Sequence, residues 1–144
     1  MPTARDDPYG RFNFIVEIDG VPRAGFSEVE GLAAEIEPIE YREGADRRSS
    51  SRLLPGLTRD ARVVLRRGFG GDATLFEWWK AVRDGALDRR AVSIVLLDEK
   101  REQVARWNLV RAWPTKYEGP ALDARNSEVA LETLELVHEG LELE

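Results

Sequence analysis

Cysteine is absent from the chain, and its 144 residues include a single histidine, His138. Without cysteine the protein can form neither a disulfide framework nor a thiolate metal site. His138 lies beside Glu139 at the end of a strand-like segment, without a second histidine or the HExxH spacing of a zinc enzyme. We interpret it as a strand-end residue rather than a general base. The sequence therefore predicts no metal, no cofactor and no enzymatic activity.

Long hydrophobic runs are also missing. No stretch approaches the roughly 18 apolar residues of a membrane span, and residues 1–8 contain no apolar signal-peptide core. We expect no membrane anchor and no N-terminal signal, with folding and assembly in the cytoplasm. An excess of positive charge is missing as well, since 21 Lys+Arg stand against 27 Asp+Glu and give a formal charge of −6. A chain that repels polyanions is a poor candidate for a nucleic-acid-binding barrel.

The overall composition is typical of one folded domain. Hydrophobic residues make up 42% and charged residues 33%, which lies outside the low-hydrophobicity regime of disordered chains. The length matches one domain rather than two. Residues 1–8 are polar and include two prolines, so we expect an arm there and a single β domain over residues 9–144.

Strand-like apolar patterns recur along the domain. They cover residues 12–18, 32–43, 62–67, 91–97, 104–113 and 128–138. Asp19-Gly20 follows the first of these segments as a hairpin turn, and Pro38 interrupts the second, which we expect to be bent or to lie at an edge. Many strands, short turns and one helix predict a mainly β fold, an antiparallel β-sandwich or barrel with one flanking α-helix.

The one convincing helix is predicted over residues 73–87. Asp72 stands where it can cap the helix, and apolar residues recur at helical spacing. The face that we expect to pack on the sheet consists of Leu75, Trp78, Trp79 and Val82. The preceding Gly68-Phe69-Gly70-Gly71 comes with neither a Walker lysine nor GxGxxG spacing, so a capped loop is a better interpretation than a phosphate site.

Residues 44–57 follow neither a helical nor a strand period, which predicts an extended loop. Loops of this length inside a compact domain are uncommon, and those that exist usually bind something or stay disordered. The candidate contact residues are Gly44, Asp46, Arg47, Arg48, Ser49, Arg52, Leu53, Leu54, Pro55 and Gly56. Their basic run lacks interleaved aromatic residues and belongs to an acidic protein, so an acidic protein surface is a better candidate partner than nucleic acid.

Two interpretations of function remain open on the residues alone. Exposed strand edges are templates for pairing with another chain, so a strand-rich protein without a catalytic constellation is suited to self-association. The alternative is a small β-barrel that binds a ligand or cofactor in a pocket. No residue pattern in the sequence supports this alternative. Carboxylates such as Glu132, Glu135 and Glu139 are interpreted as belonging to solvated strand faces.

Segments along nearly the whole chain carry a family resemblance. They are Asp7-Pro8-Tyr9, Phe12-Asn13-Phe14, Val16-Glu17-Ile18-Asp19-Gly20, Gly25-Phe26-Ser27-Glu28-Val29, Gly31-Leu32, Glu40-Tyr41-Arg42-Glu43-Gly44, Leu54-Pro55-Gly56-Leu57-Thr58, Leu65-Arg66-Arg67-Gly68, Arg89-Arg90, Val92-Ser93-Ile94, Ala105-Arg106-Trp107-Asn108, Ala112-Trp113-Pro114, Lys116-Tyr117-Glu118-Gly119-Pro120, Glu132-Thr133-Leu134-Glu135-Leu136 and His138-Glu139-Gly140. In this order they resemble the inner tube proteins of contractile phage tails and of related extracellular contractile injection systems.

The resemblance implies a structural protein. Copies of the chain would form a hexameric ring with a continuous lumenal β-barrel, and rings would stack into a hollow tube that sheath contraction drives through a target envelope. The implied partners are the chain itself, a sheath protein, baseplate and tube-terminating proteins, and a cargo effector or nucleic acid in the lumen. The loop over residues 44–57 would reach an adjacent subunit and contribute to stacking within a phage-tail-like particle.

Overall fold

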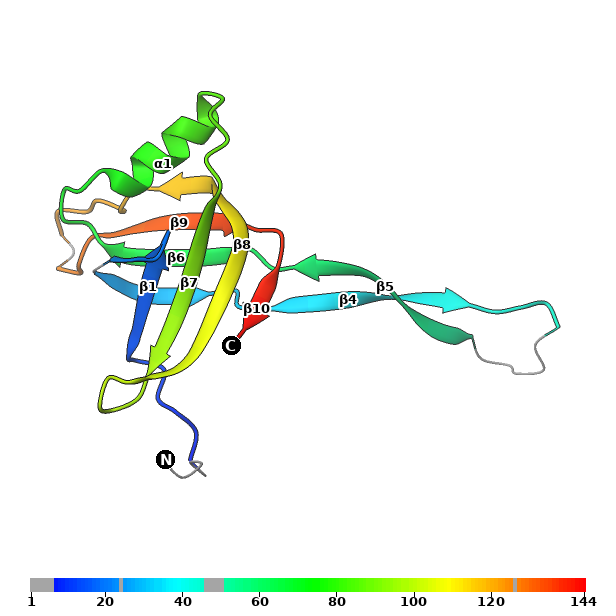
Figure 1. Ribbon diagram of the computed structural model, residues 1–144. Coiled ribbons are helices and arrows are strands. Elements are labelled where there is room, and N and C mark those ends of the chain that lie inside the picture. The colour runs from blue at the N-terminus through cyan, green and yellow to red at the C-terminus, as the bar shows by residue number, and fades with distance from the viewer. Residues whose placement is uncertain (1–6, 24, 46–50, 126) are drawn as a thin grey trace.

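The computed structural model describes residues 7–23, 25–45, 51–125 and 127–144. Strands dominate this part of the chain, and one helix lies beside them (Figure 1). The elements are β1 (Phe14–Ile18), β2 (Val21–Arg23), β3 (Phe26–Glu30), β4 (Ala34–Tyr41), β5 (Arg52–Asp60), β6 (Val63–Gly68), α1 (Thr74–Arg83), β7 (Arg90–Leu97), β8 (Gln103–Glu118), β9 (Leu131–Val137) and β10 (Leu141–Leu143). All strand pairs in these ranges are antiparallel. The expectation of a mainly β, antiparallel fold with a single helix is confirmed.

The long strand β8 connects the two halves of the main sheet. The strand order is β2-β1-β7-β8-β9-β6-β3, with β10 also paired to β8. The first half of β8 pairs with β7 and β10, whereas its second half, from Trp113 to Glu118, pairs with β9. Arg111 adopts a positive φ of 51°, and a register shift follows between Pro114 and Lys116. Irregularities of this kind bend a strand, so the sheet curves around one core (Figure 1).

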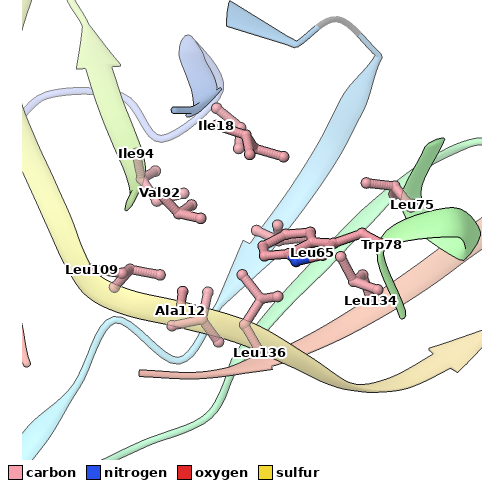
Figure 2. Packing of buried hydrophobic residues seen from close by; sticks show 12 residues of the cluster. Ile18, Leu65, Leu75, Trp78, Val92, Ile94, Leu109, Ala112, Leu134 and Leu136 are labelled. Carbon is pink, nitrogen blue, oxygen red and sulfur yellow. The ribbon is translucent and has the colours of Figure 1, made fainter. Parts of the chain in front are cut away.

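The core fills the inside of this curved sheet (Figure 2). Alternate residues of β6 and β9 point inward, which leaves Val63, Leu65, Leu134 and Leu136 completely buried. The other fully packed members are Val16, Ile18, Leu75, Trp78, Val92, Ile94, Leu109 and Ala112. A strand places successive side chains on opposite faces, so the period of two in the sequence becomes one apolar and one more polar face of the sheet.

Helix α1 closes one side of the core. Leu75 and Trp78 are buried, and Trp79 and Val82 pack against the core at partial burial. The helix is also held by its indole groups. The indole N–H of Trp78 donates to the carbonyl oxygen of Asp88 at 2.7 Å, and that of Trp79 donates to a carbonyl oxygen of β8 at 3.2 Å. A buried tryptophan contributes a large apolar contact area. Because its indole N–H has an acceptor, no buried donor is left without a hydrogen bond.

The helix is shorter than the expected range of residues 73–87. It begins at Thr74, whose N–H donates to Asp72 Oδ1 at 3.0 Å, and it ends at Arg83. Gly85 then adopts a φ of 99° and donates its N–H to the carbonyl oxygen of Val82. This left-handed ending stops the helix, because glycine adopts it without steric cost. No helix in the described residues is long and apolar enough to pass through a bilayer.

The prediction of an extended loop over residues 44–57 is wrong for the second half of this range. Arg52 to Leu57 belong to β5, which pairs with β4 along its length. Strand β4 spans Ala34–Tyr41, inside the predicted segment 32–43, and its register shifts beside Pro38 as the proline indicated. Gly44 is described and exposed, whereas residues 46–50, which include Asp46, Arg47, Arg48 and Ser49, lie outside the described residues.

Replacing Trp78 tests how much the helix contributes to the fold. Trp78→Ala should lower the free energy of unfolding by about 3–5 kcal/mol, because it leaves a cavity beneath α1. The exposed helix residue Lys80 provides the control, since Lys80→Ala should change stability by less than about 0.5 kcal/mol. Urea denaturation, followed at protein concentrations too low for association, measures both. Equal stability of the two variants would contradict the packing described for α1.

Candidate assembly interface

The hairpin of β4 and β5 forms a sheet of its own. It has no ladder to the main sheet, and it projects from the body of the domain as a long arm (Figure 1). Every residue of β4 is exposed, as is every residue of β5 except Gly56 and Asp60. A two-stranded hairpin standing alone in water is marginally stable. The exposed hairpin is therefore a candidate for a surface that a partner covers.

Apolar side chains cover much of this arm. Those exposed to water are Ile36 at 59%, Ile39 at 51%, Tyr41 at 42%, Leu53 at 67%, Leu54 at 46% and Leu57 at 74%. The register places Ile39 opposite Leu54, while Leu53 lies opposite Glu40 on the other face of the ribbon. Both faces thus expose apolar surface, which in a soluble protein marks an interaction site.

A bulge in β5 gives the hairpin its bend. The register moves from Ile36↔Thr58 to Pro38↔Pro55, so two residues of β5, Gly56 and Leu57, lie opposite one residue of β4. A side chain at position 56 would put its Cβ 2.6 Å from the carbonyl oxygen of Glu37. Glycine is therefore required there by close approach. The Glu37 carboxylate also accepts two hydrogen bonds from Arg59, at 2.9 and 3.0 Å, but this exposed ion pair contributes at most about 1 kcal/mol.

The main sheet also has strand edges that nothing in the described chain pairs with. β2 and β3 stand at the two ends of the strand order, and β10 bonds only to β8. β2 and β10 have three residues each, and β3 has five. Short edge strands limit random aggregation while they still offer N–H and C=O groups to a specific partner. The body thus presents three edges in addition to the hairpin.

A buried polar network links β6, β8, β9 and α1. The guanidinium of Arg67 on β6 pairs with the carboxylate of Glu132 on β9, and both side chains are buried. Arg67 also donates to the hydroxyl of Thr74 in α1 at 3.3 Å, and the Tyr117 hydroxyl of β8 donates to Glu132 at 2.7 Å. Burial raises the pKa of Tyr117 to about 12, and the hydrogen bond to Glu132 and its negative charge act in the same direction. Because these charges are paired, the network holds the four elements in one arrangement.

The other polar residues of interest are His138 and the carboxylates. His138 lies just after β9, at the strand-end position expected from the sequence, and its Nδ1 accepts the N–H of Gly140 at 3.2 Å. Within the described ranges no three of His, Asp and Glu come together as metal ligands. Glu132, one of the carboxylates interpreted as solvated, is instead buried against Arg67. That assignment is corrected.

Residues 10–142 match the family described as T4-like virus tail tube protein gp19. The chain belongs to this family. The resemblance to inner tube proteins, drawn above from the sequence segments, is confirmed. No curated protein sequence matches this tail tube protein.

Solved structures agree with the family assignment. A chain from the PVC sheath-tube complex in its extended state, an extracellular contractile injection system, is 26% identical, with a TM-score of 0.86 over 96% of this tube protein and 93% of that chain. A chain from the anti-feeding prophage tube terminating cap is 25% identical, with a TM-score of 0.87 over 100% and 95%. Hcp1 from Flavobacterium johnsoniae is 15% identical, with a TM-score of 0.55 over 90% and 93%, and shares the fold.

The structure brings only part of the expected contact set together. Arg52, Leu53, Leu54, Pro55 and Gly56 lie on β5, on one arm with the exposed apolar residues of β4. Sequence reasoning did not select Ile36, Ile39, Tyr41 or Leu57 as contact residues. The sequence signal was partial: Pro38 interrupts an alternating segment and Pro55 an apolar run. The structure pairs these two prolines across the hairpin. The helix face of Leu75, Trp78, Trp79 and Val82 lies against the core and takes no part in this surface.

Replacing Gly56 tests the bend of the hairpin. Gly56→Val should open the hairpin, because its Cβ cannot stand 2.6 Å from the Glu37 carbonyl oxygen. Trypsin should then cut the tube protein faster at Arg52 and Arg59, while the unfolding midpoint of the body stays unchanged. Gly44→Val is the matched control, since a Cβ at Gly44 meets nothing within 4 Å. Wild-type cleavage rates in Gly56→Val would argue against the close approach.

Replacing Tyr117 tests the buried network. The folded tube protein holds this phenol protonated, with its pKa raised from 10.0 to about 12. Its contribution to stability is therefore complete below pH 10.0 and is lost as the pH rises towards about 12. Tyrosinate absorbance should show a transition near pH 12 that Tyr117→Phe abolishes.

Tyr117→Phe should also lower the free energy of unfolding near neutral pH by about 1–3 kcal/mol, because Glu132 loses a donor. The control is Thr115→Ser, a conservative change on the same strand that keeps the hydroxyl group. It shows the effect of a substitution that leaves the network intact. A high-pH transition that survives in Tyr117→Phe would assign it to another tyrosine.

Proposed function

We propose that this chain is a structural subunit of the inner tube of a contractile injection system or phage tail, and that hexameric rings of it stack into a hollow tube. The observation that carries the proposal is the projecting β4–β5 hairpin, which exposes apolar residues on both faces and has no partner sheet within the described chain. Membership of the tail tube family supports it. So does the likeness to a chain of a sheath-tube complex.

Ring formation follows from the open strand edges. When the edge of one sheet pairs with an edge of the next copy, the backbone groups of both are satisfied. Such a head-to-tail contact uses two different surfaces, and repeated rotation closes it into a ring. A sheet that continues from subunit to subunit around the ring encloses a lumen with a continuous β-barrel. The hairpin then remains to reach an adjacent subunit and stack one ring on the next.

The proposed mechanism is mechanical and breaks no covalent bond. A sheath shortens around the tube, the stiff tube is driven through a target envelope, and a cargo effector or nucleic acid passes along the lumen. The formal charge of −6 suits this task, because an acidic wall does not hold a polyanion. The partners are the chain itself, a sheath protein, and baseplate and tube-terminating proteins. Assembly takes place in the cytoplasm, and the product is part of a phage-tail-like particle.

The alternative of a small ligand-binding barrel is less well supported. Its expected outcome is a compact protein that a ligand stabilises against heat. The family match and the likeness to tube structures favour the tube subunit. Arg67, Glu132, Thr74 and Tyr117 hydrogen-bond to one another, and His138 Nε2 is the one buried side-chain nitrogen or oxygen atom in the described residues that has no partner.

Negative-stain microscopy of the concentrated protein tests the proposal. The wild-type chain should form six-fold rings or stacked tubes. Leu53→Asp should abolish stacking and leave folding intact, because it places a charge on a hairpin residue that is 67% exposed and touches no part of the core. Leu122→Asp is the matched control at a residue that is 86% exposed outside the hairpin, and it should assemble as the wild type does. Neither rings nor tubes at any concentration would overturn the proposed function.

A further inference from the structure

Two short segments join the hairpin to the body of the domain (Figure 1). They are residues 31–33, between β3 and β4, and residues 61–62, between β5 and β6. The ladder of β3 and β6 ends where Glu30 pairs with Val64, and the ladder of β4 and β5 begins where Ala34 pairs with Asp60. We call the two segments the joint. Because no strand ladder crosses it, the joint alone sets the direction in which the hairpin leaves the body.

The two segments of the joint come closest at Gly31. This residue adopts a φ of 92°, a conformation that side chains disfavour and glycine accepts. A Cβ at position 31 would clash with the carbonyl oxygen of Arg62, and it would lie 3.0 Å from the carbonyl carbon of Arg62 and 3.2 Å from the Cα of Val63. All three are backbone atoms, which cannot rotate aside as the end of a side chain can. Only glycine therefore allows the two segments to pass so closely.

Contacts on both sides of Gly31 hold the joint in one arrangement. On the body side, Leu32 packs against the core and Val63 is completely buried. On the hairpin side, the N–H of Ala33 donates to the carbonyl oxygen of Gly31 at 2.8 Å. The N–H of Ala61 donates to the carbonyl oxygen of Ala33 at 3.0 Å, which connects the two segments. The joint is thus built as a fixed angle rather than as a free hinge.

The length of the hairpin makes this angle important. A strand rises about 3.3 Å per residue, so the eight residues of β4 form an arm of about 26 Å. A tilt of about 15° at the joint would move the far end of that arm by about 7 Å, which exceeds the spacing of about 4.8 Å between paired strands. A small change at the joint would therefore bring the exposed apolar residues of the hairpin to the wrong place on a partner.

We propose that Gly31 is a positioning residue of the assembly. Its close approach to Arg62 fixes the direction of the hairpin relative to the body, and thereby the position of one ring relative to the next. This inference rests on the proposed function, because the direction of the arm matters only where the arm reaches a partner. It assigns the geometry of stacking to a residue at the root of the hairpin, outside the apolar surface of β4 and β5.

Spin-label distances test the joint in the free subunit. The chain has no cysteine of its own, so Lys80→Cys on α1 and Leu53→Cys on β5 place one label on the body and one on the hairpin. Pulsed EPR of dilute protein should give one narrow distribution of distances. Adding Gly31→Ala should shift its mean by about 5 Å or more, because the new Cβ pushes the two segments apart at the root of a long arm.

Gly25→Ala, in the same pair of labels, is the matched control. Gly25 adopts a φ of 88°, close to that of Gly31, but a Cβ there meets nothing within 4 Å. Both variants therefore carry a similar backbone strain, and only Gly31→Ala adds the clash. The distribution of Gly25→Ala should match that of the unsubstituted labelled chain. Equal distributions for Gly31→Ala and Gly25→Ala would overturn the positioning role and leave the tube function standing.

Circular dichroism checks that Gly31→Ala keeps the folded body. Should the body unfold, the EPR measurement is repeated in trimethylamine N-oxide, which favours the folded state. A variant that stays unfolded there would show that Gly31 serves the fold of the body, and the proposal would fail.

Negative-stain microscopy of the unlabelled variants then measures the consequence for assembly. Gly31→Ala should form rings but lose stacked tubes, whereas Gly25→Ala should stack as the wild type does. Normal stacking by Gly31→Ala would contradict its positioning role. Absence of rings and tubes from the wild-type chain would overturn the tube function, while the EPR comparison would still decide whether Gly31 sets the direction of the hairpin.

Discussion

Unsatisfied backbone groups at strand edges are the constraint on which the rest of this structure depends. Each N–H and C=O on an open edge must bond either to water or to another strand. In β4 and β5 this need coincides with six exposed apolar side chains on a ribbon of two strands. A partner that offers both a strand and an apolar surface meets the two needs at once. The chemistry of the hairpin therefore suits it to self-association.

The body of the domain satisfies most of its backbone groups internally. Most of its strands bond on both sides, and its core residues are completely buried. The pair of Arg67 and Glu132 adds a polar brace between β6 and β9, which Tyr117 extends to β8 and Thr74 to α1. Buried charges contribute little net stability, but they penalise every packing in which a partner is missing. A well-packed body that keeps open strand edges is suited to a subunit of a tube.

The sequence predicted those elements that have one buried face. Burial alternates along β1, β6 and β9 because one side of each strand meets the core. The helix face of Leu75 and Trp78 could be identified for the same reason. β5 could not be identified in this way. Its two faces are both exposed, its leucines are adjacent at Leu53 and Leu54, and the bulge at Gly56 breaks the period of two.

The candidate interface was predictable only in outline. Leu53, Leu54, Pro55 and Gly56 were selected for contact, and they lie on the projecting arm, but as part of a strand rather than a loop. The contribution of β4 was hidden, since Leu32, Ala34 and Ile36 have the spacing of an ordinary half-buried strand. The edge strands β2 and β10 were too short to give a pattern, with three residues each. Their existence depends on pairing with distant residues of β1 and β8.

Composition, charge and periodicity alone indicated a mainly β fold with a single helix, and the sequence itself gives a net negative charge and no cysteine chemistry. The order of its segments along the chain was enough to indicate the family. Only the tertiary structure decided that β4 and β5 leave the body as a separate ribbon, that Glu132 is buried against Arg67, and that β3 is a terminal strand of the main sheet. These features arise from contacts between residues far apart in the chain, and a local pattern carries no information about which strand lies beside which.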